Sequence, residues 1–321
     1  MKKLRSSLIA ATTMPLQDDQ KATAKMSELT TKQASTGFSS LITKMSNKNK
    51  KPTAKPTPAA PKNAYTVDAN AKTHTDVVRQ IKEIQAKQAA ENPQPEGVPF
   101  DFTKSHLHIG LPCYGGLLLE STMTSIIKFV LLASKVGLNW SLDTMANESL
   151  VTRARNNLMA KMMTNTAATH FMFIDADIRF DANAIFQMIA ADKDIISGAY
   201  PKKALPIAYN LNLKQQTKIQ GPLFTVDTAA TGFLMFKRKV YEDLIAAHPT
   251  AKYVDDVGLG KQYEPMMYAI FDCVIDEKGH YLSEDWTFCR RASALGYDIW
   301  CDGRVLLNHS GTYEFVGDLD K

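Results

Sequence analysis

From His106 onward, short apolar runs alternate with segments of helical periodicity, and this alternation limits the chain to a few folds. Ser121 is the expected N-cap of the first helix, and Gly137 its expected end. Strands joined by such helices are typical of right-handed crossovers in a largely parallel sheet with helices on both faces. We therefore expect one α/β domain over residues 101–321. Strands are predicted at 106–112, 138–143, 170–174 and 193–200, helices at 121–137, 148–165 and 181–191, and two further strands and a helix within 222–247.

Residues 1–100 differ from this domain in composition. They hold 16 Lys and Arg against 8 Asp and Glu, whereas the rest of the chain holds 22 against 25. The stretch 44–63 is rich in Lys and Pro and offers too little apolar surface to offset the entropy lost on ordering. A short amphipathic helix is predicted at 74–92, with Val77, Ile81 and Ile84 on one side. We expect a disordered basic tail, serving either as a solvated linker or as a tether to an anionic partner.

Several classes of protein are disfavoured by composition. No apolar run approaches the roughly 18–20 residues that span a bilayer, and the apolar stretch near the N-terminus is too short and too polar for a signal peptide. The four cysteines, at 113, 273, 289 and 301, form no CxxC pair, which is typical of reduced structural thiols. We therefore expect a cytoplasmic protein without a transmembrane segment.

The stretch FMFIDADIRFDANAIF (171–186) places two carboxylates directly after a buried strand. In an open parallel sheet, ligands bind outside the carboxyl ends of the strands, where Asp175 and Asp177 are expected. Clustered carboxylates repel unless a cation neutralises them, and Mg²⁺ or Mn²⁺ prefers oxygen ligands while leaving positions for phosphates. The alternative is that Asp177 or Asp181 only caps the next helix, a role that fits Asp181 better. The pattern thus predicts a metal–diphosphate site at Asp175 and Asp177.

Two arginines precede this motif in the segment TRARNN (152–157). Arg suits a diphosphate because its planar fork binds two oxygens at once. Arg153 and Arg155 are two residues apart, so a helix points them in different directions and at most one need face the cleft. Alternatively, both are solvated helix charges.

Further downstream, Glu284 and Asp285 open a helix predicted to end at Gly296, and a loop then carries His309. The acidic pair is also explained as favourable charge at a helix N-terminus. Thr231 and Gly232 precede Phe233 at the end of another predicted strand, where small residues either admit a ligand to the backbone or simply pack.

In their order and spacing, these motifs resemble those of nucleotide-sugar-dependent glycosyltransferases of the GT-A fold, above all family 2-like enzymes and their viral and phage relatives. The resemblance covers about 105–312. It rests on R-A-R-N, F-I-D-A-D-I, D-K-D-I-I-S-G-A-Y and S-E-D-W-x-F-C-R-R-x-x-x-x-G-Y. It implies a transferase dependent on Mn²⁺ or Mg²⁺ that moves a sugar from a nucleotide diphosphate sugar, most commonly a UDP-sugar, to an acceptor hydroxyl with inversion. A viral chain of this kind would act in the host cytoplasm.

The resemblance also implies roles for individual residues. Asp175 and Asp177 bind the metal–nucleotide diphosphate, chiefly through Asp177, and His309 completes the metal shell. Asp285 is the catalytic base, and Glu284 or Trp286 shapes the sugar or acceptor pocket. The full expected nucleotide-sugar-binding set is Pro112, Tyr114, Asp143, Arg153, Arg155, Asp175, Ala176, Thr231, Gly232 and Trp286.

The chain departs from the family pattern in two places. The second strand ends in LDTMANES instead of paired acids, and no Q-x-x-R-W follows the acidic pair, which argues against a processive polymer synthase.

Two other classes of protein stay open. One is a phosphohydrolase of the haloacid dehalogenase type with Asp175 as nucleophile, although such enzymes usually have Thr or Val where Ile178 stands. The other is a non-catalytic interaction protein that acts through the basic tail. The acceptor is open among a glycan, a protein, a lipid-linked molecule and a modified nucleic acid.

Overall fold

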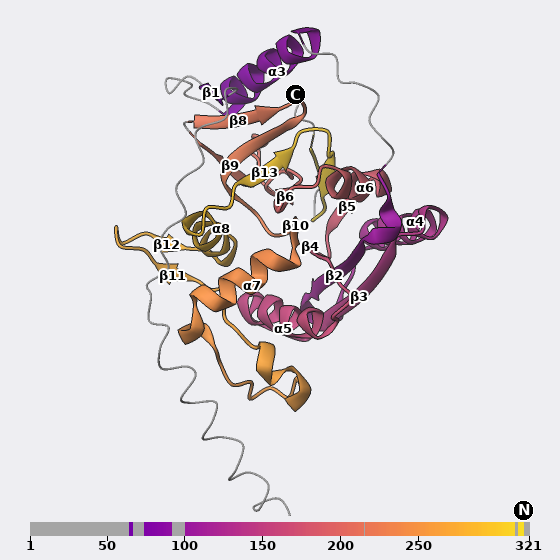
Figure 1. Cartoon of the computed structure of the whole chain (residues 1–321), viewed down its shortest axis with the longest axis vertical. Coiled ribbons are helices and arrows are strands. Elements are labelled where there is room, and N and C mark those ends of the chain that lie inside the picture. The colour runs from indigo at the N-terminus through magenta and orange to yellow at the C-terminus, as the bar shows by residue number, and fades with distance from the viewer. Residues whose placement is uncertain (1–63, 67–73, 92–99, 215, 312–313, 318–321) are drawn as a thin grey trace, which may run out of the picture. The chain divides into compact units, whose positions relative to one another are not determined.

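A computed structural model of the chain describes residues 64–66, 74–91, 100–214, 216–311 and 314–317. The central sheet has the strand order β1-β8-β9-β13-β6-β10-β4-β2-β3, with β7 beside β9 (Figure 1). Its strands are β1 (Ala64–Thr66), β2 (His106–Cys113), β3 (Asn139–Ala146), β4 (His170–Ile174), β6 (Ile195–Ser197), β7 (Leu211–Leu213), β8 (Gln216–Gln220), β9 (Leu223–Ala229), β10 (Phe233–Lys237) and β13 (Ile299–Asp302).

The strands of this sheet run mostly in one direction. β2 pairs in parallel with β3 and β4, and β6 pairs in parallel with β13. β10 lies antiparallel between β4 and β6, so that β3, β2, β4, β6 and β13 share one direction. The predicted α/β fold with a largely parallel central sheet is therefore confirmed. Because β10 is reversed, its first residues lie at the same edge as the carboxyl ends of β4 and β6.

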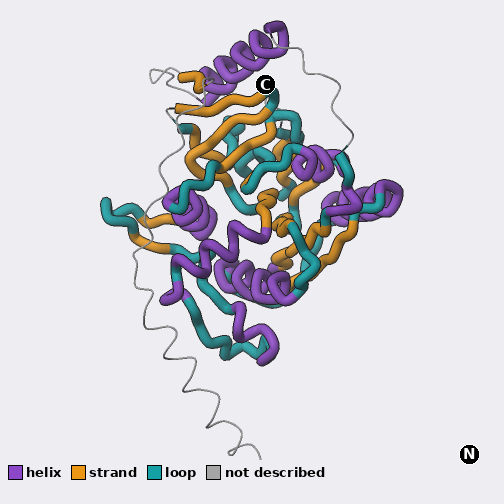
Figure 2. The backbone as a smooth tube through the Cα atoms, viewed as in Figure 1, coloured by secondary structure: helices purple, strands orange, loops and turns teal. Residues whose placement is uncertain are grey.

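Helices cover both faces of the sheet, as Figure 2 shows. The two faces of β4 explain why. Phe171 and Phe173 belong to one apolar core with residues of α5, α7 and α8, whereas Met172 and Ile174 belong to another with residues of α4 and α6. Alternate side chains of a strand point to opposite faces, so a wholly apolar strand needs cover on both sides. The helices are α3 (His74–Glu91), α4 (Glu120–Val136), α5 (Val151–Thr164), α6 (Ala182–Ala190), α7 (Arg238–Ala247) and α8 (Glu284–Ala294).

Short elements complete the fold. A small sheet joins β15 (Phe315–Val316), β14 (Leu307–His309) and β5 (Ile178–Phe180), and a hairpin joins β11 (Val274–Ile275) to β12 (Tyr281–Leu282). Among the described residues, no helix combines the length and apolar character that a membrane crossing requires. All four cysteines are unpaired. Short 3-10 helices lie at Phe102–Lys104, Tyr114–Gly116, Pro249–Ala251 and Lys261–Met266.

Two predicted helix caps agree with the structure, whereas the helix predicted to begin at residue 148 begins at Val151. Gly137 ends α4 in the left-handed conformation, with φ of 74°, and the Asp181 carboxylate caps α6 by accepting the Asn183 N–H at 2.8 Å. The Ser121 cap was wrong, because α4 already begins at Glu120. Leu119 occupies the cap position there, without a side-chain hydrogen bond, and its N–H donates to the carbonyl of Ala176.

The helix predicted at 74–92 is present as α3. Its Ile81 is 3% exposed and belongs to the same core as Phe171, and Ile84 packs against that core. β1 pairs with β8 at the edge of the sheet, and α3 contacts β8. Residues 1–63, 67–73 and 92–99 lie outside the described part of the chain, so the disordered tail and the boundary at residue 101 stay predictions.

Candidate functional site

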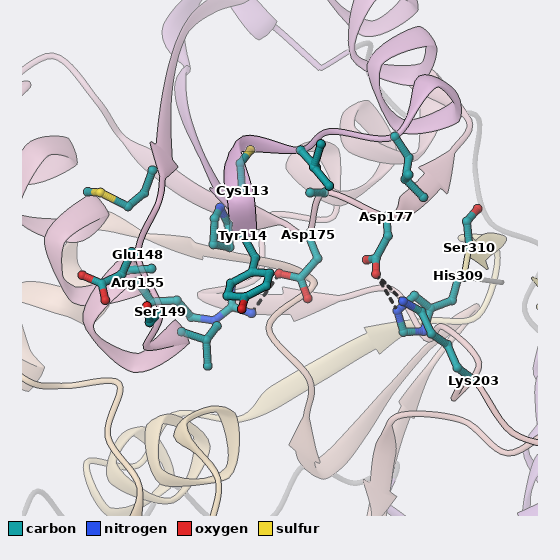
Figure 3. Close-up of a pocket in the computed structure, with 18 residues that line it drawn as sticks. Cys113, Tyr114, Glu148, Ser149, Arg155, Asp175, Asp177, Lys203, His309 and Ser310 are labelled. Atoms are coloured by element: carbon teal, nitrogen blue, oxygen red, sulfur yellow. Dashed lines mark hydrogen bonds and ion pairs between the residues drawn. The ribbon is translucent and has the colours of Figure 1, made fainter.

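A cavity of about 500 Å³ opens at the sheet edge where β2, β3 and β4 end (Figure 3). Its volume falls within the range of small-molecule sites. It is lined by Pro112, Cys113, Tyr114, Leu117, Leu119, Met145, Glu148, Ser149, Val151, Ala154, Arg155, Asp175, Ala176, Asp177, Lys203, His309, Ser310 and Gly311.

The acidic turn 175–177 is held at this cavity by its main chain. The N–H of Asp175 donates to the carbonyl of Gly232 at 2.9 Å, and the carbonyls of Ala176 and Asp177 accept from Leu119 and Ser310, each at 2.9 Å. Three segments distant in sequence therefore fix the turn. Its two carboxylates point to different partners, as Figure 3 shows.

Asp175 is bound by a buried arginine. The Nη2 of Arg155 donates to Asp175 Oδ1 at 2.8 Å, and its Nε donates to Glu284 Oε1 at 3.3 Å. Burial acts to lower the pKa of Arg155, but the two carboxylates outweigh it and hold the pKa above its ordinary value. Nη1 is buried without a hydrogen-bond partner among the described residues. An unsatisfied buried donor costs about 1–3 kcal/mol, so an acceptor on a ligand or water stabilises this arrangement.

Asp177 faces a histidine and a lysine instead. β14 pairs with β5 so that His309 lies opposite Ile178, which brings His309 Nε2 to 3.5 Å from Asp177 Oδ2. Lys203 Nζ forms an ion pair with the same oxygen. Although burial opposes it, hydrogen bonds from His309 and Lys203 bring the pKa of Asp177 below its ordinary value.

The tautomer of His309 follows from the hydrogen bond at its Nδ1 atom. Nδ1 lies 2.9 Å from the carbonyl of Pro201, which can only accept, so Nδ1 carries a proton and donates. When Nε2 also carries a proton, it donates to Asp177, whereas in the neutral ring Nε2 directs its lone pair toward Asp177. A carboxylate oxygen and an imidazole nitrogen that face each other in this way fit a shared divalent cation, and the Nδ1 hydrogen bond is the usual support of a metal-binding His.

The predicted trio of metal ligands is not brought together. Within the described part of the chain, no group of three or more His, Cys, Asp or Glu side chains is close enough to hold a metal. Asp175 turns to Arg155, which leaves Asp177 and His309 as the pair that could hold one. The carboxylate of Asp175 is bound by a buried guanidinium instead, so its role as a metal ligand stays a prediction.

The acidic pair at the start of α8 lies behind Arg155. Glu284 reaches the guanidinium, whereas Asp285 Oδ1 accepts from the Ser283 hydroxyl and from the Trp286 N–H at 2.8 Å. Burial raises the pKa of Asp285 above its ordinary value. Its Oδ2 makes no hydrogen bond or ion pair with the described residues. Neither Asp285 nor Trp286 lines the cavity.

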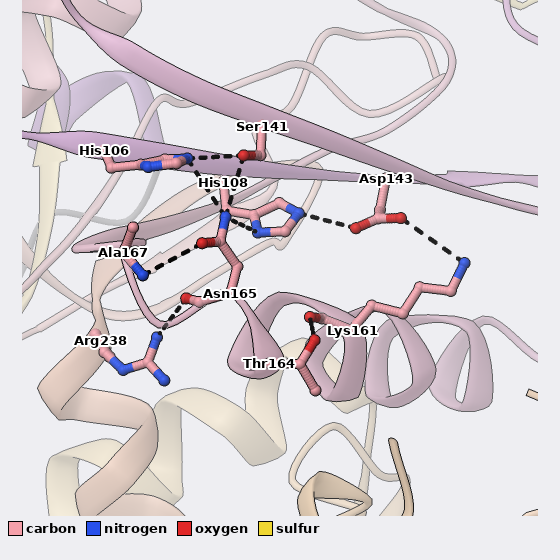
Figure 4. Close-up of polar contacts among 9 residues, drawn as sticks. All are labelled: His106, His108, Ser141, Asp143, Lys161, Thr164, Asn165, Ala167 and Arg238. Carbon is pink, nitrogen blue, oxygen red and sulfur yellow. Dashed lines mark hydrogen bonds and ion pairs between the residues drawn. The ribbon is translucent and has the colours of Figure 1, made fainter. Parts of the chain in front are cut away.

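Of the residues expected near a nucleoside, Pro112 and Tyr114 line the cavity and Asp143 does not. Its predicted place at a strand end is wrong, because β3 continues to Ala146. Asp143 instead lies mid-strand in a polar network (Figure 4), with its Oδ2 2.9 Å from His108 Nε2 and its Oδ1 3.8 Å from Lys161 Nζ. The hydrogen bond from His108 lowers the pKa of Asp143.

Only one arginine of the 152–157 motif faces the cavity, as its spacing predicted. Arg153 binds Glu148 through two hydrogen bonds of 2.7 and 2.9 Å and does not line the cavity. Asn156 exchanges two hydrogen bonds with the main chain of Phe271. This motif therefore also ties α5 to the segment before β11.

Thr231 and Gly232 lie in the turn before β10, not at the end of a strand as predicted. They do not line the cavity, but Gly232 supports it. Its N–H donates to the hydroxyl of the buried Tyr200 at 3.2 Å, and its carbonyl accepts from Asp175. A Cβ on Gly232 would lie 2.5 Å from the Tyr200 hydroxyl and 2.7 Å from Asp175 Oδ2.

We therefore expect Gly232→Ala to lower the free energy of unfolding by about 1–3 kcal/mol, because a methyl group there forces Tyr200 and Asp175 apart. Urea denaturation measures this change. Gly303→Ala is the matched control, since a Cβ at Gly303 meets its nearest atom at an ordinary 3.4 Å. Equal stability of the two variants would contradict the close packing behind Asp175.

Three residues of the site were not predicted from the sequence: Tyr200, Lys203 and Glu148. Tyr200 and Lys203 follow β6, whose end lies at the same sheet edge as Asp175. The local sequence signal for this part of the site was the basic pair Lys202 and Lys203 after a predicted strand. Glu148 was expected only as part of a helix, but it precedes α5 and lines the cavity.

No protein-family model matches the chain, and no curated protein is similar to it in sequence. Among solved structures, A197 from STIV is 14% identical, with 66% of this chain and 94% of that chain covered and a TM-score of 0.39. Inositol-1-phosphate CTP transferase from T. maritima is 12% identical, covering 62% of this chain and 89% of that chain with a TM-score of 0.33. Mannose-1-phosphate geranyltransferase from Thermus thermophilus is 10% identical, covering 51% and 68% with a TM-score of 0.32. Likenesses this distant do not assign an activity.

Proposed function

We propose that this chain is a metal-dependent glycosyltransferase that moves a sugar from a nucleotide diphosphate sugar, most commonly a UDP-sugar, to an acceptor hydroxyl with inversion. One observation carries the proposal. A single cavity holds a carboxylate–imidazole pair, Asp177 and His309, and a buried guanidinium, Arg155, joined through the short turn that contains Ala176.

The charges around the cavity favour a cation together with an anionic ligand. Three carboxylates line it, Glu148, Asp175 and Asp177, against two cations, Arg155 and Lys203. A diphosphate alone would meet an excess of negative charge. A divalent metal held by Asp177 and His309 would neutralise charge on the diphosphate leaving group. The donor set of one carboxylate and one imidazole suits Mn²⁺ or Mg²⁺ whose remaining positions are filled by phosphate and water oxygens.

The opposite wall is suited to a nucleoside. Pro112, Met145 and Val151 supply apolar surface, and the Tyr114 ring, 77% exposed, stands at the mouth of the cavity. A base or ribose covers such surface readily, because an exposed aromatic ring provides a stacking face. This wall lies at the ends of β2 and β3, next to the acidic turn.

Arg155 and the start of α8 would act on the reacting groups. Arg155 offers an unpaired N–H donor, and its position between Asp175 and Glu284 fixes the guanidinium plane. Asp285 would take the acceptor proton at Oδ2, while Ser283 and the Trp286 N–H hold Oδ1. A raised pKa suits a general base, since it brings the carboxylate closer to the pKa of the proton it receives. Glu284 would then position Arg155 without touching the donor.

The phosphohydrolase alternative gains no support from the site. Its nucleophile would be Asp175, yet Oδ1 of that residue is bound by a buried arginine. The two carboxylates of the turn also face different partners.

A donor screen tests the proposal. Purified protein with Mn²⁺ is incubated with a panel of nucleotide sugars, and release of the nucleoside diphosphate is followed with and without EDTA. We expect release from one donor class that stops in EDTA and is absent in Asp177→Asn. Release that persists undiminished in EDTA, or hydrolysis of simple phosphate esters instead, would contradict the proposed function.

A further inference from the structure

Lys203 is a charged residue of the cavity for which the proposed function gives no role. Its Nζ forms an ion pair with Asp177 Oδ2, the same oxygen that lies 3.5 Å from His309 Nε2. A cation therefore already binds the carboxylate oxygen that the metal would take. In Figure 3, Lys203 lies beside His309 at one end of the cavity.

The loop that carries Lys203 is fixed at its base and open at its tip. Pro201 and Tyr209 form an antiparallel bridge, and the Lys202 N–H donates to the Ala208 carbonyl at 2.6 Å. Pro201 also accepts the hydrogen bond from His309 Nδ1 at 2.9 Å. Residues 202–207 are exposed, with Leu205 at 69%. The base of the loop thus holds the histidine in place, while the side chain of Lys203 is 38% exposed and bordered by solvent.

An ammonium group and a divalent cation repel at contact distance, so both cannot bind the same carboxylate oxygen at full strength. When the metal binds alone, displacing Lys203 costs the ion pair with Asp177. When a diphosphate binds as well, it adds negative charge beside the displaced ammonium. A lysine is suited to binding the diphosphate after displacement, because its charge is concentrated at the end of a flexible side chain.

We propose that Lys203 is a tethered cation that pairs with Asp177 when no metal is bound and transfers to the donor diphosphate when the metal binds this carboxylate. It thereby opposes binding of the metal alone and favours joint binding of metal and nucleotide diphosphate. This inference rests on the proposed function for its ligand, but its direct consequence concerns the metal without any nucleotide.

The test is titration of Mn²⁺ into the full-length protein by calorimetry, first without nucleotide and then with a nucleoside diphosphate. Lys203→Gln should bind Mn²⁺ alone at least about fivefold more tightly than the wild type, since one competing charge is removed. At saturating Mn²⁺, the same variant should bind the diphosphate about fivefold more weakly. Lys203→Arg keeps the charge and should stay near the wild type in both titrations.

Lys202→Gln is the matched control, because Lys202 is the adjacent exposed lysine and does not line the cavity. It should change neither affinity. If Lys203→Gln binds Mn²⁺ alone no more tightly than the wild type, the inference is overturned. Donor turnover by the wild type tests the proposed function separately. If the wild type is active but Lys203→Gln has unchanged affinity for Mn²⁺, only the role of Lys203 is refuted.

Discussion

Asp177→Asn should lower kcat/KM for the nucleotide-sugar donor by about 100-fold or more while leaving the protein folded. Asp177 is the carboxylate that faces His309, and no other Asp or Glu side chain of the described residues lies with that pair. An amide binds a divalent cation far more weakly than a carboxylate does, so both metal affinity and turnover should fall. Nucleoside diphosphate release across a Mn²⁺ titration measures the loss.

Asp181→Asn is the control for this substitution. Asp181 belongs to the same acidic segment but caps α6 instead of lining the cavity. Asn is about as good a cap as Asp, so stability should change by only a few tenths of a kcal/mol and turnover should not change. Circular dichroism and a thermal melt check that both variants are folded. Full activity in Asp177→Asn would remove the metal site from the mechanism.

Local patterns were sufficient where structure depends on nearby residues. The helix following the acidic turn, its Asp181 cap and the single inward-facing arginine all follow from helical spacing and cap chemistry, and the structure has all three. The strand HFMFI was predicted to the residue, because an apolar run covered on both faces has sharp ends.

Local patterns failed where contacts are long-range. His309 reaches Asp177 only because β14 pairs with β5, a contact between segments about 130 residues apart that no spacing rule predicts. Asp175 turns away from Asp177 because a buried arginine on α5 binds it. The end of β3 was missed because the strand is extended through Ala146 by its pairing with β2, a contact between segments distant in sequence. Lys203 was missed because a basic pair in a loop after a strand is usually only solvated.

Asp285→Asn should lower kcat by about 100- to 10,000-fold with donor affinity nearly unchanged, because a general base acts in the transition state and not in donor binding. The variant should fold normally, since the amide oxygen of Asn can still accept from Ser283 and from the Trp286 N–H. Asp227→Asn is the control. It removes a carboxylate that pairs with Arg290 of the same helix at 2.9 Å but lies outside the cavity.

The pH dependence of turnover supplies an independent test of the same residue. Burial raises the pKa of Asp285, and only the deprotonated carboxylate can accept a proton. Turnover should therefore fall as the pH decreases through this raised pKa, and the acid limb of the kcat profile should lie above the ordinary Asp value of about 3.9. In Asp285→Asn the residual rate should lose this limb, whereas Asp227→Asn should keep it.

A base on the far side of the anomeric carbon from the leaving group also requires inversion. The product configuration, read by NMR, must therefore be opposite to that of the donor. Retention, or an acid limb that survives in Asp285→Asn, would assign the proton transfer to another group.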